Sequence, residues 1–311
     1  MGMSKPRIVS LLPSATEIVC ALGLGAHLVG RSHACDFPLE VRQIPSMTRP
    51  RVNALKPSRT LHRSVTKLIE KVLSVFEVDA ERLRAAKPDF IITQHQCEAC
   101  AVTEKDLTDA LAKWTGSKPT VISLAPTKLS EVWASFGTVG EILDLGWSGR
   151  ELAEQARERV EVIAERAPPL KDRPTVACVE WLDPPMIAGN WIPDLVVAAG
   201  GRPVMAKSGQ HAESTTLGKI AEASVDAMVL MPCGFDLERT MTEGREFLAR
   251  PSMAKTRSVR DGRVWAVDGN AYFNRPGPRL MTSVEILTEI LNPGLFNVGY
   301  QGIGWESLAD R

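Results

Sequence analysis

The sequence lacks any long apolar run and any excess of one charge. Nowhere do roughly 18 apolar residues follow one another, so no transmembrane helix is predicted. Lys and Arg together number 37, as do Asp and Glu together, and the formal net charge is therefore 0. Such a chain has no overall basic surface for nucleic acid or for an anionic membrane. We therefore expect a small-molecule ligand, no nucleic-acid partner and no membrane span.

Cysteine is also scarce. Six cysteines in 311 residues are too few for a framework of disulfides. Residues 8–25 contain Pro13, Ser14 and Glu17, which interrupt the apolar stretch that a secretory signal needs. We therefore expect a cytoplasmic protein with reduced thiols.

Common nucleotide-binding and catalytic patterns are missing as well. The sequence has no G-x-G-x-x-G, Walker A, G-x-S-x-G or H-E-x-x-H pattern. Each of these would indicate a particular phosphate, nucleophile or zinc site. What is present is ordinary globular composition, with 44% hydrophobic and 24% charged residues, over a length typical of about two domains.

Short apolar, β-branched runs alternate with helical patterns, which predicts an α/β fold with parallel sheets. The expected strands cover residues 7–12, 28–30, 89–93, 120–124, 175–180, 224–230 and 263–267. The expected helices cover residues 17–22, 64–76, 79–86, 104–115, 130–143, 148–166, 192–199 and 283–291.

The order of elements starts again in the second half of the chain. Residues 224–230 repeat the pattern of residues 87–93, in which an Asp is followed by a buried strand. In both places a short helix precedes this pattern. The long helix before this restart has a single narrow apolar face, which is typical of a connector. We predict an N-terminal α/β lobe (1–147), a single long connector helix (148–167), a C-terminal α/β lobe (168–296) and a tail (297–311).

Ligands of open parallel sheets bind beyond the carboxyl ends of the strands, so the residues that follow the predicted strands are the candidate ligand-binding residues. They are Ser14, His33, Asp36, Gln94, Glu180, Trp181, Trp191, Phe235, Asp268, Asn270, Tyr272, Phe273, Arg275 and Arg279. The aromatic rings among them suit a flat, partly apolar ligand, and the arginines suit a carboxylate or phosphate. The alternative to ligand binding is that the rings pack in the core and the arginines are exposed to solvent.

Histidine and cysteine gather in the same loops. His95, Cys97 and Cys100 have a spacing at which two thiolates and an imidazole can hold one soft metal ion. His33, Cys35 and Cys233 are the candidates to complete such a site. A redox dithiol and ordinary packing of small side chains are the alternatives.

Several segments resemble one family. Residues 7–25 (RIVSLLPSATEIVCALGLG), residues 33–38, residues 86–93 (AKPDFIIT), the connector helix and Gly200-Gly201 are similar to the substrate-binding proteins of vitamin B12 and iron–siderophore ABC transporters. The resemblance is strongest to the vitamin B12-binding members and covers roughly residues 7–292. It implies the class III periplasmic-binding-protein-like fold, with the ligand held between two lobes.

Two departures from the family bear on function. The family is exported, whereas this chain shows no leader, so we assign it to a cytosolic branch. The family also presents one glutamate on each lobe to its permease. Glu81 matches the first, but Gly218 stands at the second position, with Glu213 and Glu222 out of register. This argues against docking to an ABC permease.

The sequence therefore predicts a non-catalytic protein that holds a corrinoid (cobalamin-like) or other metal-chelate ligand between its lobes. One alternative is a metal-dependent or thiol-dependent enzyme that uses the His/Cys-lined cleft. Another is the substrate-binding component of an ABC transporter.

Overall fold

The first strand of the chain lies inside a parallel sheet. In the order β2-β1-β5-β6, every neighbouring pair of strands is parallel. These strands are β1 (Ile8–Ser10), β2 (Leu28–Arg31), β5 (Phe90–Gln94) and β6 (Thr120–Leu124). Ile91 in the middle of β5 is opposite Val9 of β1 and Val121 of β6. The apolar, β-branched run of β5 suits a strand with neighbours on both sides.

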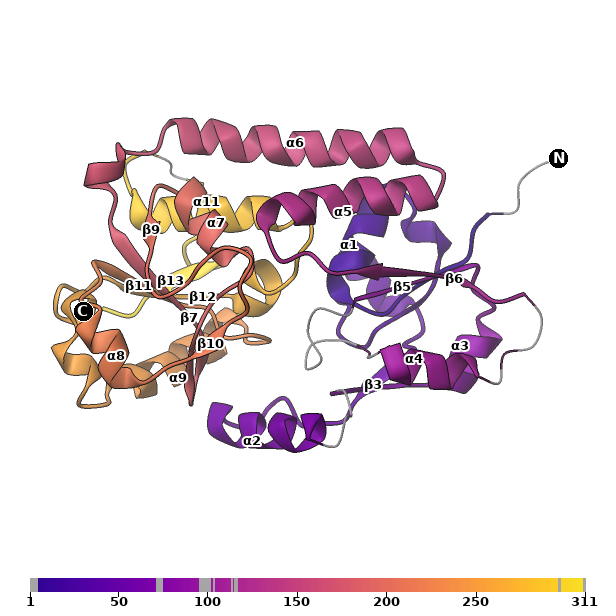
Figure 1. Ribbon diagram of the computed structural model, residues 1–311, viewed down its shortest axis with the longest axis horizontal. Coiled ribbons are helices and arrows are strands. Elements are labelled where there is room, and N and C mark those ends of the chain that lie inside the picture. Colours follow the sequence, from indigo (N-terminus) through magenta and orange to yellow (C-terminus); the bar gives the residue numbers. More distant parts are fainter. Residues whose placement is uncertain are drawn as a thin grey trace. The chain divides into compact units, whose positions relative to one another are not determined.

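The computed structural model describes residues 5–70, 75–94, 102, 104–112, 114, 117–295 and 298–309. The chain divides into two compact units. Unit 1 consists of Met1–Lys56, Thr60–Pro126 and Trp133–Glu154, and unit 2 of Pro57–Arg59, Thr127–Val132 and Gln155–Arg311. Each unit has its own sheet, as Figure 1 shows, and each has its own hydrophobic cluster.

The helices of the first half alternate with these strands. They are α1 (Pro13–Ala21), α2 (Ser58–Ile69), α3 (Ala80–Ala85), α4 (Glu104–Leu111), α5 (Leu129–Ile142) and α6 (Gly146–Glu165). Helix α1 begins with Pro13, whose fixed φ suits the first helical position, and ends before Gly23, which has φ +77°. No side chain caps α1, because its N-cap is Leu12. The antiparallel pair β3 (Thr48–Pro50) and β4 (Phe76–Val78) completes unit 1.

Unit 2 is built on a second sheet, with the order β10-β8-β7-β11-β12-β13 and with β9 also paired to β7. Its strands are β7 (Thr175–Leu182), β8 (Pro185–Ile187), β9 (Arg202–Pro203), β10 (Glu213–Ser214), β11 (Ala227–Leu230), β12 (Val264–Val267) and β13 (Trp305–Ser307). Its later helices are α7 (Ile192–Ala198), α8 (Leu217–Glu222), α9 (Leu237–Leu248), α10 (Arg257–Arg260) and α11 (Leu280–Leu291).

The parallel strands of the two units have the same order. In unit 2, β9, β7, β11 and β12 are parallel neighbours, and they correspond to β2, β1, β5 and β6 of unit 1. Both units therefore contain the repeated α/β pattern that the sequence predicts. Short antiparallel strands extend the second sheet at both edges.

Several element boundaries differ from those expected. The helix expected over residues 64–76 begins earlier, at Ser58, and Phe76 starts strand β4 instead. The strand expected to end at Glu180 continues to Leu182, because β8 folds back and pairs with its last residues. The short strands β8, β10 and β13 were not expected, since two or three residues carry no recognisable alternation.

Candidate functional site

The carboxyl ends of the parallel strands carry the candidate residues in each unit. We call Ser14, His33, Cys35, Asp36 and Gln94 the unit 1 edge. We call the corresponding residues at the end of β7 and after β11 and β12, together with Trp191, the unit 2 edge. The latter are Glu180, Trp181, Trp191, Cys233, Phe235, Asp268, Asn270, Tyr272, Phe273, Arg275 and Arg279.

A buried hydroxyl and thiol network holds the start of α1 in the unit 1 edge. The Thr16 hydroxyl oxygen lies 2.9 Å from Ser10 Oγ and 3.0 Å from Cys35 Sγ, so its single hydrogen can serve only one of the two contacts. Ser14 and Cys35 are almost completely buried, with exposed fractions of 2% and 1%. Cys35 is therefore held as part of the interior, where a thiol is a small packing group with a weak hydrogen bond.

His33 is fixed by contacts on both its backbone and its ring. Its N–H donates to Thr48 Oγ1 at 3.0 Å, and its ring Nδ1 lies 2.7 Å from the same oxygen. Its ring also meets Phe76 edge-on, with centroids 4.6 Å apart. Burial, and secondarily the nearby Arg31 cation, lower the pKa of His33 below its usual range, which favours a neutral imidazole at pH 7.

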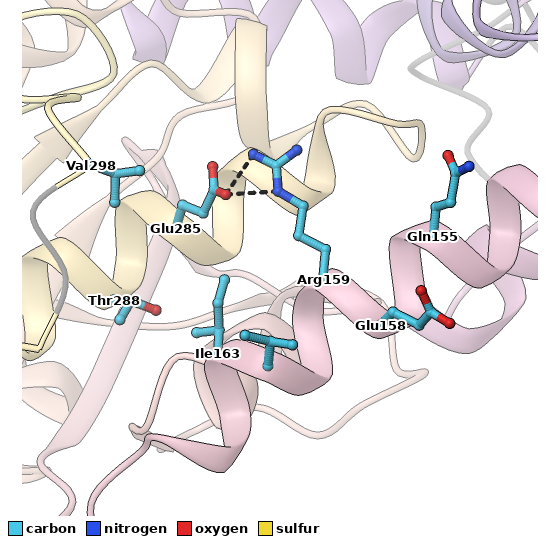
Figure 2. Close-up of a pocket in the computed structure, with 8 residues that line it drawn as sticks. Gln155, Glu158, Arg159, Ile163, Glu285, Thr288 and Val298 are labelled. Atoms are coloured by element: carbon cyan, nitrogen blue, oxygen red, sulfur yellow. Dashed lines mark hydrogen bonds and ion pairs between the residues drawn. The ribbon is translucent and has the colours of Figure 1, made fainter.

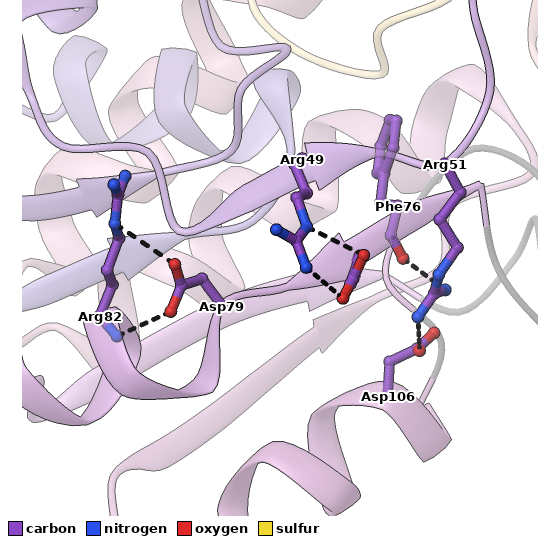
Figure 3. Close-up of polar contacts among 7 residues, drawn as sticks. Arg49, Arg51, Phe76, Asp79, Arg82 and Asp106 are labelled. Atoms are coloured by element: carbon purple, nitrogen blue, oxygen red, sulfur yellow. Dashed lines mark hydrogen bonds and ion pairs between the residues drawn. The ribbon is translucent and has the colours of Figure 1, made fainter.

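The strand pair β3–β4 holds Phe76 in that position, as Figure 3 shows. Arg51 donates to the Phe76 carbonyl oxygen at 2.8 Å and to Asp106 Oδ1 at 3.0 Å. Arg49 and Glu77 form a two-bond ion pair across the strands, at 2.9 and 2.7 Å. The Phe76 ring that contacts His33 is therefore held in place by the β3–β4 pair and by Arg51.

Gln94 ends strand β5 with an unsatisfied group. Its side chain is buried, with an exposed fraction of 7%, and its Oε1 has no hydrogen-bond partner among the described residues. A buried acceptor without a partner is uncommon and costs free energy. Asp36, by contrast, is half-buried in the loop after β2.

The structure tests the metal candidates only in part. His95, Cys97 and Cys100 lie outside the described residues. In the part of the chain that is described, no group of three or more His, Cys, Asp or Glu side chains could hold a metal ion. His33 and Cys35 belong to unit 1, whereas Cys233 belongs to unit 2 and donates its N–H to the Glu180 carbonyl at 3.1 Å. A metal site that includes residues 95–100 stays a prediction.

The Cys178 thiol is an interior group, and the Cys20 thiol is half-buried. Burial raises the pKa of Cys178 in β7 to about 12 and that of Cys20 in α1 to about 11. Both thiols stay protonated at neutral pH, so neither is an activated nucleophile.

The unit 2 edge begins with a stack of two rings and a guanidinium. Trp181 lies within β7 rather than after it, and its half-buried ring meets Phe235 edge-on, with centroids 5.5 Å apart. Arg239, in the first turn of α9, lies over the Phe235 ring, with its Cζ 3.4 Å from the ring centroid. Sequence reasoning missed Arg239. Its signal is the N-cap Asp236, which places residue 239 in the first helical turn, beside the ring-bearing loop.

A π-helix, η5 (Gly269–Phe273), follows β12 and contributes most of the polar groups. Asp268 is its N-cap and accepts the Ala271 N–H at 2.7 Å. The Asn270 N–H donates to the Phe235 carbonyl at 2.9 Å, and Arg275 Nη2 donates to Asn270 Oδ1 at 3.0 Å. The structure thus brings Trp181, Phe235, Asn270 and Arg275 together at the end of one sheet. Single-turn π-helices are often found at functional sites.

A close backbone approach fixes η5 in place. A Cβ on Gly269 would lie 2.4 Å from the Pro232 carbonyl oxygen and 2.8 Å from that of Met231. Only glycine allows this contact between the loops that follow β11 and β12.

Three of the predicted aromatic residues are in the interior. Trp191, Phe235 and Phe273 have exposed fractions of 6%, 1% and 0%. The Trp191 indole donates to the Phe273 carbonyl at 3.0 Å, so it ties α7 to η5. The half-buried rings are those of Trp181 and Tyr272, and Arg279 lies 5.7 Å from the Tyr272 ring centroid.

Burial shapes the electrostatics of this edge. It raises the pKa of the Asp268 carboxyl, and a nearby Asp236 carboxylate adds to the effect, although the Ala271 N–H opposes both. It also raises the pKa of the Tyr272 phenol. Arg275 is itself buried, with an exposed fraction of 5%, and Glu180 is half-buried. The edge is therefore a partly dry surface on which polar contacts are stronger than in water.

These features define a known class of protein. The chain belongs to the periplasmic binding protein family, whose model matches residues 8–271. It has the class III fold of that family, so the fold and the family resemblance predicted from the sequence are confirmed.

Particular relatives are distant but cover nearly the whole chain. YvrC of Bacillus subtilis, described as an ABC transporter substrate-binding lipoprotein, is 24% identical over 93% of this chain and 81% of its own length. The vitamin B12-binding protein of Vibrio cholerae is 23% identical over 90% of this chain and 86% of its own.

Solved structures agree on the fold. A periplasmic heme binding protein from Pseudomonas aeruginosa has a TM-score of 0.73 at 20% identity, covering 98% of this chain and 99% of its own. The periplasmic vitamin B12 binding protein BtuF of Vibrio cholerae has a TM-score of 0.67 at 19% identity, with coverages of 93% and 97%. Among the described residues, no helix is long and apolar enough to cross a membrane.

Proposed function

We propose that this protein binds a flat metal chelate of the corrinoid type and performs no chemistry on it. The observation that carries the proposal is the unit 2 edge, where the half-buried rings of Trp181 and Tyr272 lie beside the hydrogen-bonding groups of Asn270 and Arg275. Flat rings with a few fixed polar groups suit a large planar ligand with polar side groups. The metal ion belongs to the ligand in this proposal.

The relatives support a ligand of this size and shape. Family members similar to this chain are named for vitamin B12 and for heme, which are both large macrocyclic metal chelates. The corrin ring carries amide side groups, whereas heme carries carboxylates. Asn270 can pair with an amide as donor or acceptor, and Arg275 can donate to an amide carbonyl.

Absorbance titrations test the proposal directly. Purified protein is titrated separately with cyanocobalamin, aquocobalamin and haemin, and the absorbance bands of each ligand are followed. We expect saturable binding of a cobalamin. Saturable binding of haemin alone would contradict the corrinoid assignment, and no change with any of the three ligands would contradict the proposal as a whole.

A matched pair of tryptophan variants locates the site. Trp181→Ala should weaken binding by roughly 1–3 kcal/mol, or about 5- to 150-fold in Kd, because a ring facing the ligand is lost. Trp147 on α6 belongs to unit 1 and has an exposed fraction of 70%, so Trp147→Ala should leave the Kd unchanged. Equal effects of the two variants would contradict the placement of the ligand at the unit 2 edge.

We also propose an ABC permease as the protein partner. The sequence argued against docking, but the description of YvrC as an ABC transporter substrate-binding lipoprotein supports it. Glu81 is exposed on α3, while the equivalent helix α8 has Gly218 at the matching position and exposes Glu222 at its end. We expect membranes from the protein's own cells to retain the wild-type protein. The Glu81→Ala variant should lose this retention, and the Glu141→Ala variant should keep it. Equal retention of both variants would contradict it. The cytoplasmic location stays a prediction, which fractionation of those cells checks.

A further inference from the structure

The segment 298–309 is part of unit 2, although it lies beyond residues 8–271 that match the family model. Its strand β13 pairs antiparallel with β12, so that Trp305 is opposite Val267 and Ser307 is opposite Trp265. Leu308 at its end is buried in the core cluster that also contains Phe247. The segment predicted as a tail is therefore part of the second sheet.

A buried carboxylate on α11 depends on this segment for its hydrogen bonds. Glu289 has an exposed fraction of 7%. It accepts the backbone N–H groups of Gly299 and Tyr300, each at 3.0 Å, and the Trp305 indole N–H at 2.9 Å. A buried carboxylate is tolerated only with such partners. The middle of the segment is thus held by α11 as well as by β12.

A second carboxylate of α11 joins the same segment to α6. Figure 2 shows Arg159 of α6 reaching Glu285 of α11 at the wall of a cavity of about 500 Å³, which Val298 also lines. The Arg159 Nε lies 2.7 Å from Glu285 Oε1, and the Tyr300 hydroxyl lies 3.4 Å from Glu285 Oε2. Tyr300 is therefore held at its hydroxyl as well as at its backbone.

The segment contacts the unit 2 edge at two points. The Gly304 carbonyl accepts the Asp268 N–H at 2.9 Å, at the residue that caps η5. The Tyr300 ring meets the Tyr272 ring edge-on, with centroids 6.2 Å apart. Both contacts fix the loop that carries Asn270 and Arg275.

We propose that the segment 298–309 positions the ligand-binding loop η5, with Tyr300 and Glu289 as positioning residues. The link to ligand affinity rests on the proposed function, whereas the ordering of η5 does not. The segment makes no ligand contact in this proposal. It sets the backbone of residues 268–272, which carries Asn270 and Tyr272 and leads into Arg275.

Hydrogen exchange of the ligand-free protein tests the ordering. Tyr300→Ala removes the ring that meets Tyr272, while Tyr300→Phe keeps it. We expect amides of residues 268–274 to exchange about tenfold faster or more in Tyr300→Ala than in the wild type, because local opening becomes easier. Tyr300→Phe should stay close to the wild type. Unchanged exchange in Tyr300→Ala would overturn the proposal, even if no ligand is known.

Affinity for cobalamin or haemin, whichever the wild type binds, tests the consequence. Tyr300→Ala should raise Kd at least about fivefold, as expected for the loss of a pre-ordered loop. Met253→Ala removes a fully buried side chain from the core cluster shared with Leu308 and serves as the control for general loss of stability. Equal Kd changes in Tyr300→Ala and Met253→Ala would mean that the segment acts only through overall stability, and this would overturn the proposal. If the wild type binds neither ligand, the proposed function fails and the exchange result alone decides the positioning role.

Discussion

The carboxylate of Asp226 accepts two hydrogen bonds from Thr175, one from the backbone N–H at 2.8 Å and one from the hydroxyl at 2.7 Å. Asp226 precedes β11 and Thr175 begins β7, so this contact joins two parallel strands at their amino ends. Unit 1 has an equivalent contact, because Asp89 precedes β5 and accepts the Arg7 N–H at 2.8 Å beside β1. The repeated Asp of the sequence therefore has a structural role in both units.

Asp226→Asn should lower the free energy of unfolding at pH 7 by about 1–2 kcal/mol, because a charge-assisted hydrogen bond becomes a neutral one. The Thr175 N–H and hydroxyl, with the Arg257 cation, hold the pKa of Asp226 below its usual range. The stabilisation is therefore complete above the unfolded pKa of about 3.9 and is lost as pH falls through the lower folded pKa. Urea unfolding at pH 7 and pH 3 measures this, with the exposed Asp172→Asn as control. A difference between variant and wild type that stays constant with pH would contradict it.

Trp191→Ala should act mainly on stability. The ring is buried and its N–H bonds the Phe273 carbonyl, so the change should lower the free energy of unfolding by about 3–5 kcal/mol. Trp191→Phe keeps most of the buried area and should cost less. Denaturant unfolding compares the two, and a Trp191→Ala protein of wild-type stability would show that the ring does not belong to the core.

Gly269→Ala should destabilise unit 2 by about 1–3 kcal/mol, since the added methyl group meets backbone oxygens that cannot move independently. Gly218→Ala is the matched control, because a Cβ on that helical glycine would meet only Thr216 Oγ1, at an ordinary 3.8 Å, and the variant should gain about 0.5–1 kcal/mol. Thermal unfolding of both variants shows whether each one is less or more stable than the wild type. A neutral Gly269→Ala would mean that the loops after β11 and β12 are not closely packed.

His33 should make the protein less stable in mild acid. Its pKa is lowered on folding, chiefly by burial, so the unfolded chain takes up a proton first as pH falls below about 6.5. Stability should then decrease until the lower folded pKa is reached, and should not respond above about 6.5. In urea unfolding at pH 7.5 and 5.5, His33→Gln should reduce this dependence and the exposed His211→Gln should not. Identical pH dependence of His33→Gln and wild type would rule His33 out as the cause.

Much of the fold could be predicted because its central strands are apolar and β-branched. Strand β6 covers residues 120–124, as expected, and β5 begins one residue after Asp89, as the repeat indicated. Strands such as β13 were beyond prediction, since three residues gain their structure only from the neighbour that they pair with. Helix α2 was misplaced because Phe76, which continues its apolar pattern, is used by β4.

The candidate site could be predicted in position more than in detail. The rule of strand ends located Trp181, Asn270 and Arg275, which the structure brings to one edge. It could not separate them from Trp191 and Phe273, because a ring in a loop has the same sequence signature whether it packs inward or faces solvent. Arg239 was missed for a related reason, since stacking on Phe235 depends on the direction of α9.

The shared strand order of the two units has a consequence for protein engineering. Each sheet packs on its own hydrophobic cluster, and the chain passes from Glu154 to Gln155 within the single helix α6. A chimaera that joins the first part of this chain to the second part of a relative inside that helix takes each of these two clusters from a single parent. Such hybrids would show which part determines ligand choice.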